Sequence, residues 1–196
     1  MTGTSTAPAV VSTVGAEIPR LAAVLSAAFA DNPASDWLFQ GRQDNHHPAL
    51  FTAYLRHALA SGRVDQTADG TAVAVWIHRD GTENAGVFKR ESADAVGVNL
   101  ARLVLLEGTL YEAQPKETHW WLTFLGVLPA HCGRGYGGQL LRHAATWQGD
   151  RMAYLEATSH RLRGYFLRHG YIPGPPVRIP QGGPVVHPMW LPPDSS

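Results

Sequence analysis

The sequence predicts a single domain of the α/β (α+β) class, and three observations support this. Apolar residues recur with helical spacing in some segments and alternate in others, and the two kinds of segment follow one another along the chain. Residues 63–78 have the pattern of a β-hairpin, which indicates antiparallel pairing. The chain has 196 residues, 44% of them hydrophobic, which is enough for one sizeable core and too little for two. We therefore expect one domain over residues 1–196.

The first half of the chain predicts a strand, two helices and the hairpin. Asn32-Pro33 ends the first helix and Pro48 begins the second, because proline fits only the first turn of a helix. A turn at Asp69-Gly70 joins the strands of the hairpin. We expect a strand over residues 9–14, helices over 18–29 and 48–61, and strands over 63–66 and 71–78.

The second half begins with a segment that we expect to be a loop. The run of Trp, Leu, Thr, Phe and Val at residues 119–127 is typical of a strand buried on both faces. Ser159 can cap a helix that Gly170 ends. The other elements expected here are a helix over 96–111, a helix over 140–147, a strand over 152–157, and two strands within 171–191.

Charge and composition argue against several classes of protein. The 16 basic and 16 acidic residues cancel and form no basic run, so we expect no nucleic-acid partner. The apolar runs are far shorter than the roughly 20 residues that cross a bilayer, so we expect no membrane span. The ten histidines and single cysteine are scattered, so we expect no metal site. With no intrachain disulfide and no targeting pattern over residues 1–9, we expect a cytoplasmic protein.

A glycine-rich turn after the strand at 119–127 is the strongest functional signal. The segment from Cys132 to Gly138 lies between that strand and a helix, which gathers free backbone N–H groups at a helix N-terminus. Gly135 and Gly137 lack the Cβ atoms that would hold a diphosphate away, and Arg134 adds positive charge. The sequence therefore predicts a pyrophosphate site. A tight turn that binds nothing is the alternative.

Two other phosphate-binding loops do not fit this turn. A Walker loop ends in Gly-Lys-Ser/Thr, but Gly138 is followed by Gln139 and Leu140, so the phosphate-binding lysine and the metal-binding hydroxyl are absent from the motif. A dinucleotide-binding turn comes early in a parallel fold, whereas this turn follows a hairpin and lies two-thirds of the way along the chain. We therefore expect neither nucleoside triphosphate hydrolysis nor dinucleotide binding.

Residues 119–171 resemble the core of the GCN5-related N-acetyltransferases (GNATs), in particular small-molecule resistance enzymes such as puromycin acetyltransferase. The family's motif Gln/Arg-x-x-Gly-x-Gly/Ala matches residues 132–137, and its aromatic-rich helix ending in Gly-Phe matches residues 166–171. The stretch AFADNPASDWLF at residues 28–39 is similar to the acceptor-side helices of the family. The resemblance implies a mixed, mostly antiparallel sheet of six or seven strands with helices on both faces.

The resemblance also implies acetyl-CoA, or another acyl-CoA, as co-substrate. The pantetheine arm would pair with an open strand edge at Leu125, Gly126 and Val127. A backbone N–H held beside the thioester oxygen would stabilise the developing oxyanion. The pyrophosphate would meet the turn formed by Cys132, Gly133, Arg134, Gly135, Tyr136, Gly137 and Gly138.

Three positions depart from the family's pattern. Cys132 stands where Gln or Arg usually opens the motif, so we expect a weaker contact to the co-substrate there, and Leu162 stands where Asn is usual, so one polar contact is lost. Phe166 aligns with the tyrosine that protonates the leaving thiolate in many members. The adjacent Tyr165 replaces it only if the helix is irregular, because one residue turns a side chain by about 100 degrees. A thiolate, with an ordinary pKa of about 8.5, can also leave unassisted.

The amine that attacks must first lose a proton, so a general base is expected. Glu156, which ends the strand at 152–157, is the first candidate, and an ion pair with Arg161 or Arg163 is the alternative. His119 is the second candidate, and a structural role at the start of its strand is the alternative. The resemblance implies an acceptor site that suits a cationic, partly apolar amine. Its lining would be Asp36, Trp37, Phe39, His46, His47 and Tyr54.

These inferences predict an N-acetyltransferase in which a small-molecule amine, antibiotic-like or natural-product-like, attacks the thioester directly in a ternary complex. Two alternatives stay open. An acyl carrier protein could supply the acyl group, with Arg142, Arg161 and Arg163 around the mouth of the groove, or the chain could bind acyl-CoA without catalysis. The sequence also leaves open whether two chains form a homodimer.

Overall fold

The computed structural model describes residues 8–40, 46–80 and 85–193. Its strands are β1 (Val10–Ser12), β2 (Gly62–Thr67), β3 (Ala72–Arg79), β4 (His119–Val127), β5 (Met152–Ala157), β6 (Ile172–Pro173), β7 (Val177–Arg178) and β8 (Val185–Leu191).

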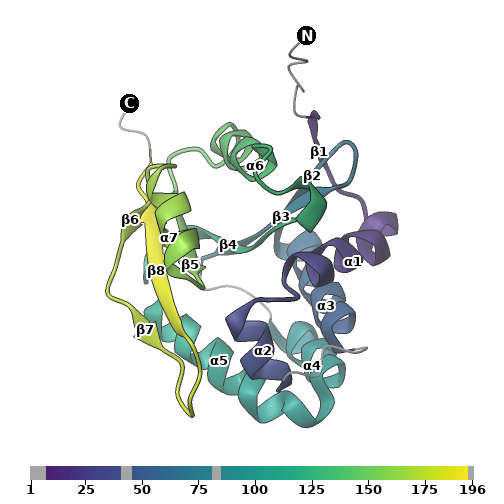
Figure 1. Ribbon diagram of the computed structural model, residues 1–196, viewed down its shortest axis with the longest axis vertical. Coiled ribbons are helices and arrows are strands. Elements are labelled where there is room, and N and C mark those ends of the chain that lie inside the picture. The colour runs from purple at the N-terminus through teal and green to yellow at the C-terminus, as the bar shows by residue number, and fades with distance from the viewer. Residues whose placement is uncertain (1–7, 41–45, 81–84, 194–196) are drawn as a thin grey trace.

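These strands form an eight-stranded sheet in the order β1-β2-β3-β4-β5-β8-β6, with β7 paired to β8 (Figure 1). Every pair is antiparallel except β4 with β5, which is parallel. The expected mixed, mostly antiparallel sheet is confirmed. It has one strand more than the upper expectation, because the C-terminal segment forms three strands where two were expected.

The helices are α1 (Ile18–Ala28), α2 (Pro33–Phe39), α3 (His46–Ser61), α4 (Ala85–Val96), α5 (Leu100–Ala113), α6 (Tyr136–Ala145) and α7 (His160–Leu167). Short 3-10 turns occupy Gly15–Glu17, Gly97–Asn99 and Pro129–His131.

Two of these helices were not expected from the periodicity of the sequence. The first helix already ends at Ala28, and Asn32-Pro33 instead starts α2: the Asn32 side chain accepts a hydrogen bond from the amide of Ala34, and Pro33 takes the first helical position. The segment before residue 96 was expected to be a loop, and α4 occupies its described part. A single helix over 96–111 was also wrong at its start, because Gly97, with φ of 51°, separates α4 from α5.

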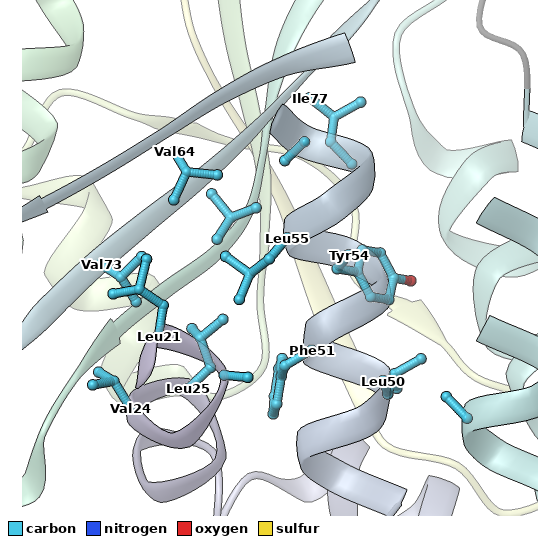
Figure 2. Close-up of a cluster of buried hydrophobic side chains, with 14 of the residues drawn as sticks. Leu21, Val24, Leu25, Leu50, Phe51, Tyr54, Leu55, Val64, Val73 and Ile77 are labelled. Atoms are coloured by element: carbon cyan, nitrogen blue, oxygen red, sulfur yellow. The ribbon is translucent and has the colours of Figure 1, made fainter. Parts of the chain in front are cut away.

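Helices cover both faces of the sheet. Successive side chains of β3 point to opposite faces and contact different helices. Val73, Val75 and Ile77 pack into one apolar cluster with α1 and α3. Ala72, Ala74 and Trp76, on the opposite face, pack into a second cluster with α6 and α7. Figure 2 shows side chains of α1 and α3 meeting those of the strands in the first cluster. The expected helices on both faces are therefore confirmed, and β4 runs through the middle of the molecule.

Gly126 in β4 permits the close packing of α1. A Cβ atom on this residue would lie 2.9 Å from Cδ2 of Leu25 and 3.2 Å from Cβ of Ala28. Such distances leave no room for a side chain. The glycine therefore brings the C-terminal half of α1 against the end of β4.

Candidate functional site

The site is organised by the separation of β4 from β5. Their parallel pairing runs only from His119 with Met152 to Trp121 with Tyr154. Beyond these pairs β5 continues along β8, and β4 continues along β3. Within the described chain, residues 122–127 of β4 thus have no strand partner on the side that faces β5. Their backbone groups form an open edge inside the sheet, at the position where Leu125, Gly126 and Val127 were expected to bind an extended ligand.

A β-bulge in β4 lies at the start of this open edge. Val75 pairs with Phe124 and the next residue, Trp76, pairs with Leu122, which leaves Thr123 as the additional residue. A bulge bends its strand and increases the local twist. The bulge therefore turns β4 away from β5 where the two strands part.

The glycine-rich turn follows directly from β4 and forms a shallow cradle. Gly133 and Gly135 have φ of 77° and 85°, which only glycine adopts readily, and a Cβ on either would meet no atom within 4 Å. The first bond of α6 runs from the amide of Gln139 to the carbonyl of Gly135. The amides of the preceding helical residues therefore have no acceptor within the helix and point toward open space. This geometry fits a pyrophosphate.

Positive charge surrounds the cradle. Arg134 is exposed within the turn. A Cβ on Gly138 would lie 3.3 Å from Nη1 of Arg142 and 2.9 Å from Cε1 of His169. Burial first, and then the charges of Arg142 and Arg168, lower the pKa of His169. An anion in the turn would thus lie beside several guanidinium groups.

The two larger side chains of the turn have different surroundings. The thiol of Cys132 is exposed, with Sγ 3.8 Å from the carbonyl oxygen of Val127. The ring of Tyr136 is buried and stacks on His131 at 5.7 Å between ring centroids. Tyr136 can therefore offer an anion its backbone amide, while its side chain belongs to the core.

Glu156 is half-buried near the end of β5, next to the open edge of β4. Its Oε2 accepts a hydrogen bond of 2.9 Å from Nε1 of Trp121, and its Oε1 has no hydrogen-bond partner among the described residues. Burial raises the pKa of Glu156 to about 7, although Trp121, Tyr154 and the charge of Arg79 oppose the shift. The carboxyl group can therefore take or release a proton near neutral pH.

The alternative for Glu156, an ion pair with an arginine of α7, does not occur. In the part of the chain that the structure describes, Glu156 pairs with neither Arg161 nor Arg163. Its carboxylate instead lines a cavity. This leaves Glu156 available for chemistry.

Tyr165 directs its hydroxyl to the same region. A Cβ on Gly137 would lie 2.8 Å from the Tyr165 oxygen, which has no hydrogen-bond partner among the described residues. Burial raises the pKa of this hydroxyl, so it stays protonated. No irregularity is needed, since α7 is an uninterrupted helix. Phe166 is buried and packs on Tyr171 at 5.5 Å between ring centroids.

A cavity of about 170 Å³ lies between the open edge of β4, the end of β5, helices α2, α3, α5 and α7, and Phe29, which directly follows α1. Glu156, Leu125 and Tyr165 line it on the side of the glycine-rich turn. Phe39, His47 and Tyr54 line it on the side of α2 and α3. The cavity thus brings the expected base, the expected acceptor side and the end of β4 together.

His119 lies elsewhere. It begins β4, and Leu125 is six residues further along, about 20 Å in an extended strand. Its ring is buried against Tyr154 at 5.6 Å, and Nδ1 lies 2.8 Å from the carbonyl oxygen of Glu117. His119 does not line the cavity, so its surroundings agree with the structural alternative.

Asp36 and Trp37 lie on the outer side of α2 rather than in the cavity lining. Asp36 is exposed. Trp37 donates from Nε1 to the carbonyl oxygen of Gln181 at 3.2 Å, and the guanidinium of Arg102 lies 5.1 Å from the centre of its ring. Trp37 therefore holds α2 against the segment before β8. The side chain of His46 lies outside the described residues.

Several residues of the site escaped sequence reasoning. Trp121 and the cluster of Phe29, Phe51 and Phe124 line the cavity, but in the sequence they look like ordinary core residues. Tyr54 donates a hydrogen bond of 2.7 Å from its hydroxyl to Oε1 of Glu107. Burial raises the pKa of Glu107, against the Tyr54 bond and the charge of Arg79. In the sequence, only the three-residue spacing of Phe51 and Tyr54, which puts both on one face of a helix, could have indicated these aromatic lining residues.

Comparisons with known proteins agree with this architecture. Residues 92–173 match the model of the acetyltransferase (GNAT) domain family. The chain is similar to a solved structure from Corynebacterium glutamicum described as histone acetyltransferase HPA2 and related acetyltransferase, with 26% identity, a TM-score of 0.75, and coverage of 97% of this chain and 99% of that one.

Two further solved structures share the fold at lower identity. Arylalkylamine N-acetyltransferase 2 from Aedes aegypti has 15% identity, a TM-score of 0.69, and coverage of 94% of this chain and 98% of its own. A polyamine N-acetyltransferase from Drosophila melanogaster has 17% identity, a TM-score of 0.70, and coverage of 94% and 99%. The chain therefore has the GNAT fold. The narrower resemblance to puromycin acetyltransferase stays a prediction.

The described residues contain no group of three or more His, Cys, Asp or Glu side chains that could hold a metal ion. No helix among them is long and apolar enough to cross a membrane.

Proposed function

We propose that this GNAT-fold chain is an acetyl-CoA-dependent N-acetyltransferase that acts on the amine of a small molecule. One observation carries the proposal. The open edge of β4 and a carboxyl group with a pKa near neutrality line one apolar cavity, and Tyr165 reaches from the lining of that cavity to Gly137 in the glycine-rich turn. The similar proteins described as arylalkylamine and polyamine N-acetyltransferases support an amine acceptor.

Each part of the site has a role in this proposal. Acetyl-CoA supplies an activated acetyl thioester. The backbone of Leu125, Gly126 and Val127 binds its pantetheine arm as a neighbouring strand would, and the amides of the turn from Cys132 to Gly138 bind its pyrophosphate. A backbone N–H of the β4 edge stabilises the negative charge that develops on the thioester oxygen.

Glu156 is the general base. Its carboxylate takes a proton from the ammonium group, directly or through water, and the neutral amine forms a bond to the thioester carbon. Collapse of the tetrahedral species breaks the C–S bond and releases the second proton of the nitrogen. One proton ends on the thiol and one goes to solvent. Tyr165, whose hydroxyl stays protonated, donates a hydrogen bond to the leaving sulfur.

The remaining expectations accompany this proposal as predictions. They are a single domain over residues 1–196, a cytoplasmic location, and a requirement for no metal. Of the arginines expected at the groove mouth for a carrier protein, Arg142 does lie beside the turn. A carrier-protein donor, and binding without catalysis, are separated from the main proposal by the experiment below.

The experiment is a calorimetric titration of the protein with acetyl-CoA, CoA and ATP, followed by a thiol-release assay with a panel of amines. Gly137→Glu would push a charged side chain toward Tyr165 and the cradle. Gly108→Glu is the matched control, because a Cβ there meets no atom within 4 Å. We expect both CoA species to bind wild type and Gly108→Glu, and neither to bind Gly137→Glu.

The outcomes separate the hypotheses. Binding followed by amine-dependent thiol release supports the proposal. Binding without thiol release from any amine means a non-catalytic binder and overturns it. If CoA does not bind while an acylated carrier protein drives amine acylation, the donor is the carrier.

A further inference from the structure

Aromatic side chains form one part of the lining of the acceptor cavity, the aromatic wall. The ring of Phe124 makes edge-to-face contacts with Phe29, Phe51 and Tyr54, at centroid distances of 5.4, 5.0 and 4.8 Å. His47 extends the group, 5.0 Å from the ring of Phe51. All five of these side chains line the cavity, so a ring bound there would meet aromatic neighbours, which rings prefer in such arrangements.

The size of the cavity agrees with a guest of that kind. Its volume is about 170 Å³. An apolar cavity of about 150 Å³ in another protein stays dry and binds benzene. A phenyl group therefore fits here, with the amine directed to the polar end of the cavity.

The single carboxylate in the described lining of the cavity can pair with one cationic group of an acceptor. Among the described residues that line it, Glu156 is the only carboxylate. Glu107 lies behind Tyr54, where its carboxylate already accepts the Tyr54 hydroxyl. A second ammonium or guanidinium group on the acceptor would have to lose its water among leucine and phenylalanine side chains with no anion to meet it.

We propose that the acceptor is a monocationic primary amine joined by a short apolar linker to an aromatic ring, with the ring against Phe51, Phe124 and Tyr54 and the nitrogen at Glu156. This inference rests on the proposed function, because it names the substrate class of the same site. Amines with two or more positive charges are predicted to be poor acceptors.

The test compares acceptors of similar length in the thiol-release assay at saturating acetyl-CoA. The probes are 2-phenylethylamine, its saturated analogue 2-cyclohexylethylamine, and the dications 1,6-diaminohexane and agmatine. We expect 2-phenylethylamine to exceed the cyclohexyl analogue in kcat/KM by up to about tenfold, through contacts between rings. We expect it to exceed the dications by about a hundredfold or more, because of the unpaired buried charge.

A variant pair locates the ring. Phe51→Leu removes one aromatic contact while keeping an apolar side chain, so the KM for 2-phenylethylamine should rise several-fold with little change in kcat. Val104→Ala, on an exposed face of α5, should leave both unchanged. The temperature of unfolding, measured for both, shows whether Phe51→Leu is folded.

The failures of the two proposals are distinguishable. If the dications are the better substrates, the aromatic class is wrong and the acetyltransferase function stands. If no amine releases thiol, calorimetry of 2-phenylethylamine with the CoA-bound protein decides. Binding would then support the ligand class while the catalytic function fails, and absence of binding would overturn the inference as well.

Discussion

Trp121 and Glu156 are joined across the point where β4 and β5 separate, by a hydrogen bond of 2.9 Å from the indole Nε1 to the carboxylate Oε2. The bond fixes one oxygen of Glu156 and leaves Oε1 to the cavity. Because burial raises the pKa of this group to about 7, both of its protonation states are populated at neutral pH. In the proposed mechanism, this pair would therefore control whether an acceptor amine can be deprotonated.

Replacing Glu156 by Gln removes the base and keeps the shape of the side chain. In the thiol-release assay we expect kcat to fall by about 10²- to 10⁴-fold, the usual contribution of a positioned acid or base. Binding of CoA, measured by calorimetry, should be unchanged, because Glu156 lies outside the turn. A variant with wild-type kcat would exclude Glu156 as the base.

The pH profile of the wild type should follow the ionisation of Glu156. The carboxylate is the active form. The ionisation of Glu156 should therefore make kcat/KM rise with pH up to about 7 and then level off. The bond from Trp121 lowers the pKa of Glu156, so Trp121→Phe should move the rise to higher pH. Trp120→Phe, which changes an adjacent ring that does not touch Glu156, should leave it in place. A Trp121→Phe profile that does not move would show that the indole does not act on Glu156.

Glu156 should also lower the stability of the protein at alkaline pH. Its pKa in the folded state is raised from 4.5 to about 7, so its charged form is unfavourable there. The penalty is absent below pH 4.5, grows as pH rises to about 7, and then stays constant at about 3 kcal/mol. In urea unfolding at pH 8, Glu156→Gln should be more stable than wild type by up to that amount. The same change at exposed Glu112 should have no such effect.

Tyr165→Phe tests the hydroxyl beside the cradle. We expect kcat to fall by about tenfold, less than for Glu156→Gln, because a thiolate is already a tolerable leaving group near neutral pH. Phe166→Leu serves as the contrast. It should lower the temperature of unfolding, since Phe166 is buried, and change kcat little. If Phe166→Leu lowered kcat and Tyr165→Phe did not, Tyr165 would not be the residue that assists the leaving thiolate.

The sequence predicted the parts of the structure that have local signals. The strands β4 and β5 begin and end where their apolar runs do, and Ser159 caps α7 through its side chain as expected. The turn was found because positive φ at Gly133 and Gly135 requires glycine, which is visible in the sequence.

The rest depends on how distant segments are aligned. Glu156 meets Trp121, 35 residues away, only because β4 pairs with β5 in one particular register. We expected Tyr165 to reach the site only if its helix were irregular, but α7 is regular and the Tyr165 hydroxyl still lies beside Gly137, because the packing of α7 against the turn decides which side chain faces it. The helix α4 was missed because polar and charged residues fill its middle and a Gly- and Asn-containing stretch precedes it, which favours a loop, whereas packing against the rest of the fold overrides weak local preference.

The parting of β4 and β5 leaves the two halves of the sheet connected by three residue pairs. An extended ligand bound in that gap would pair with β4 as a strand would. Its binding free energy would therefore add to the stability of the whole sheet. The amide hydrogens of residues 122–127 that face the gap would then exchange slowly with solvent only while the ligand is present. The co-substrate proposed for this gap would therefore also contribute to the stability of the fold.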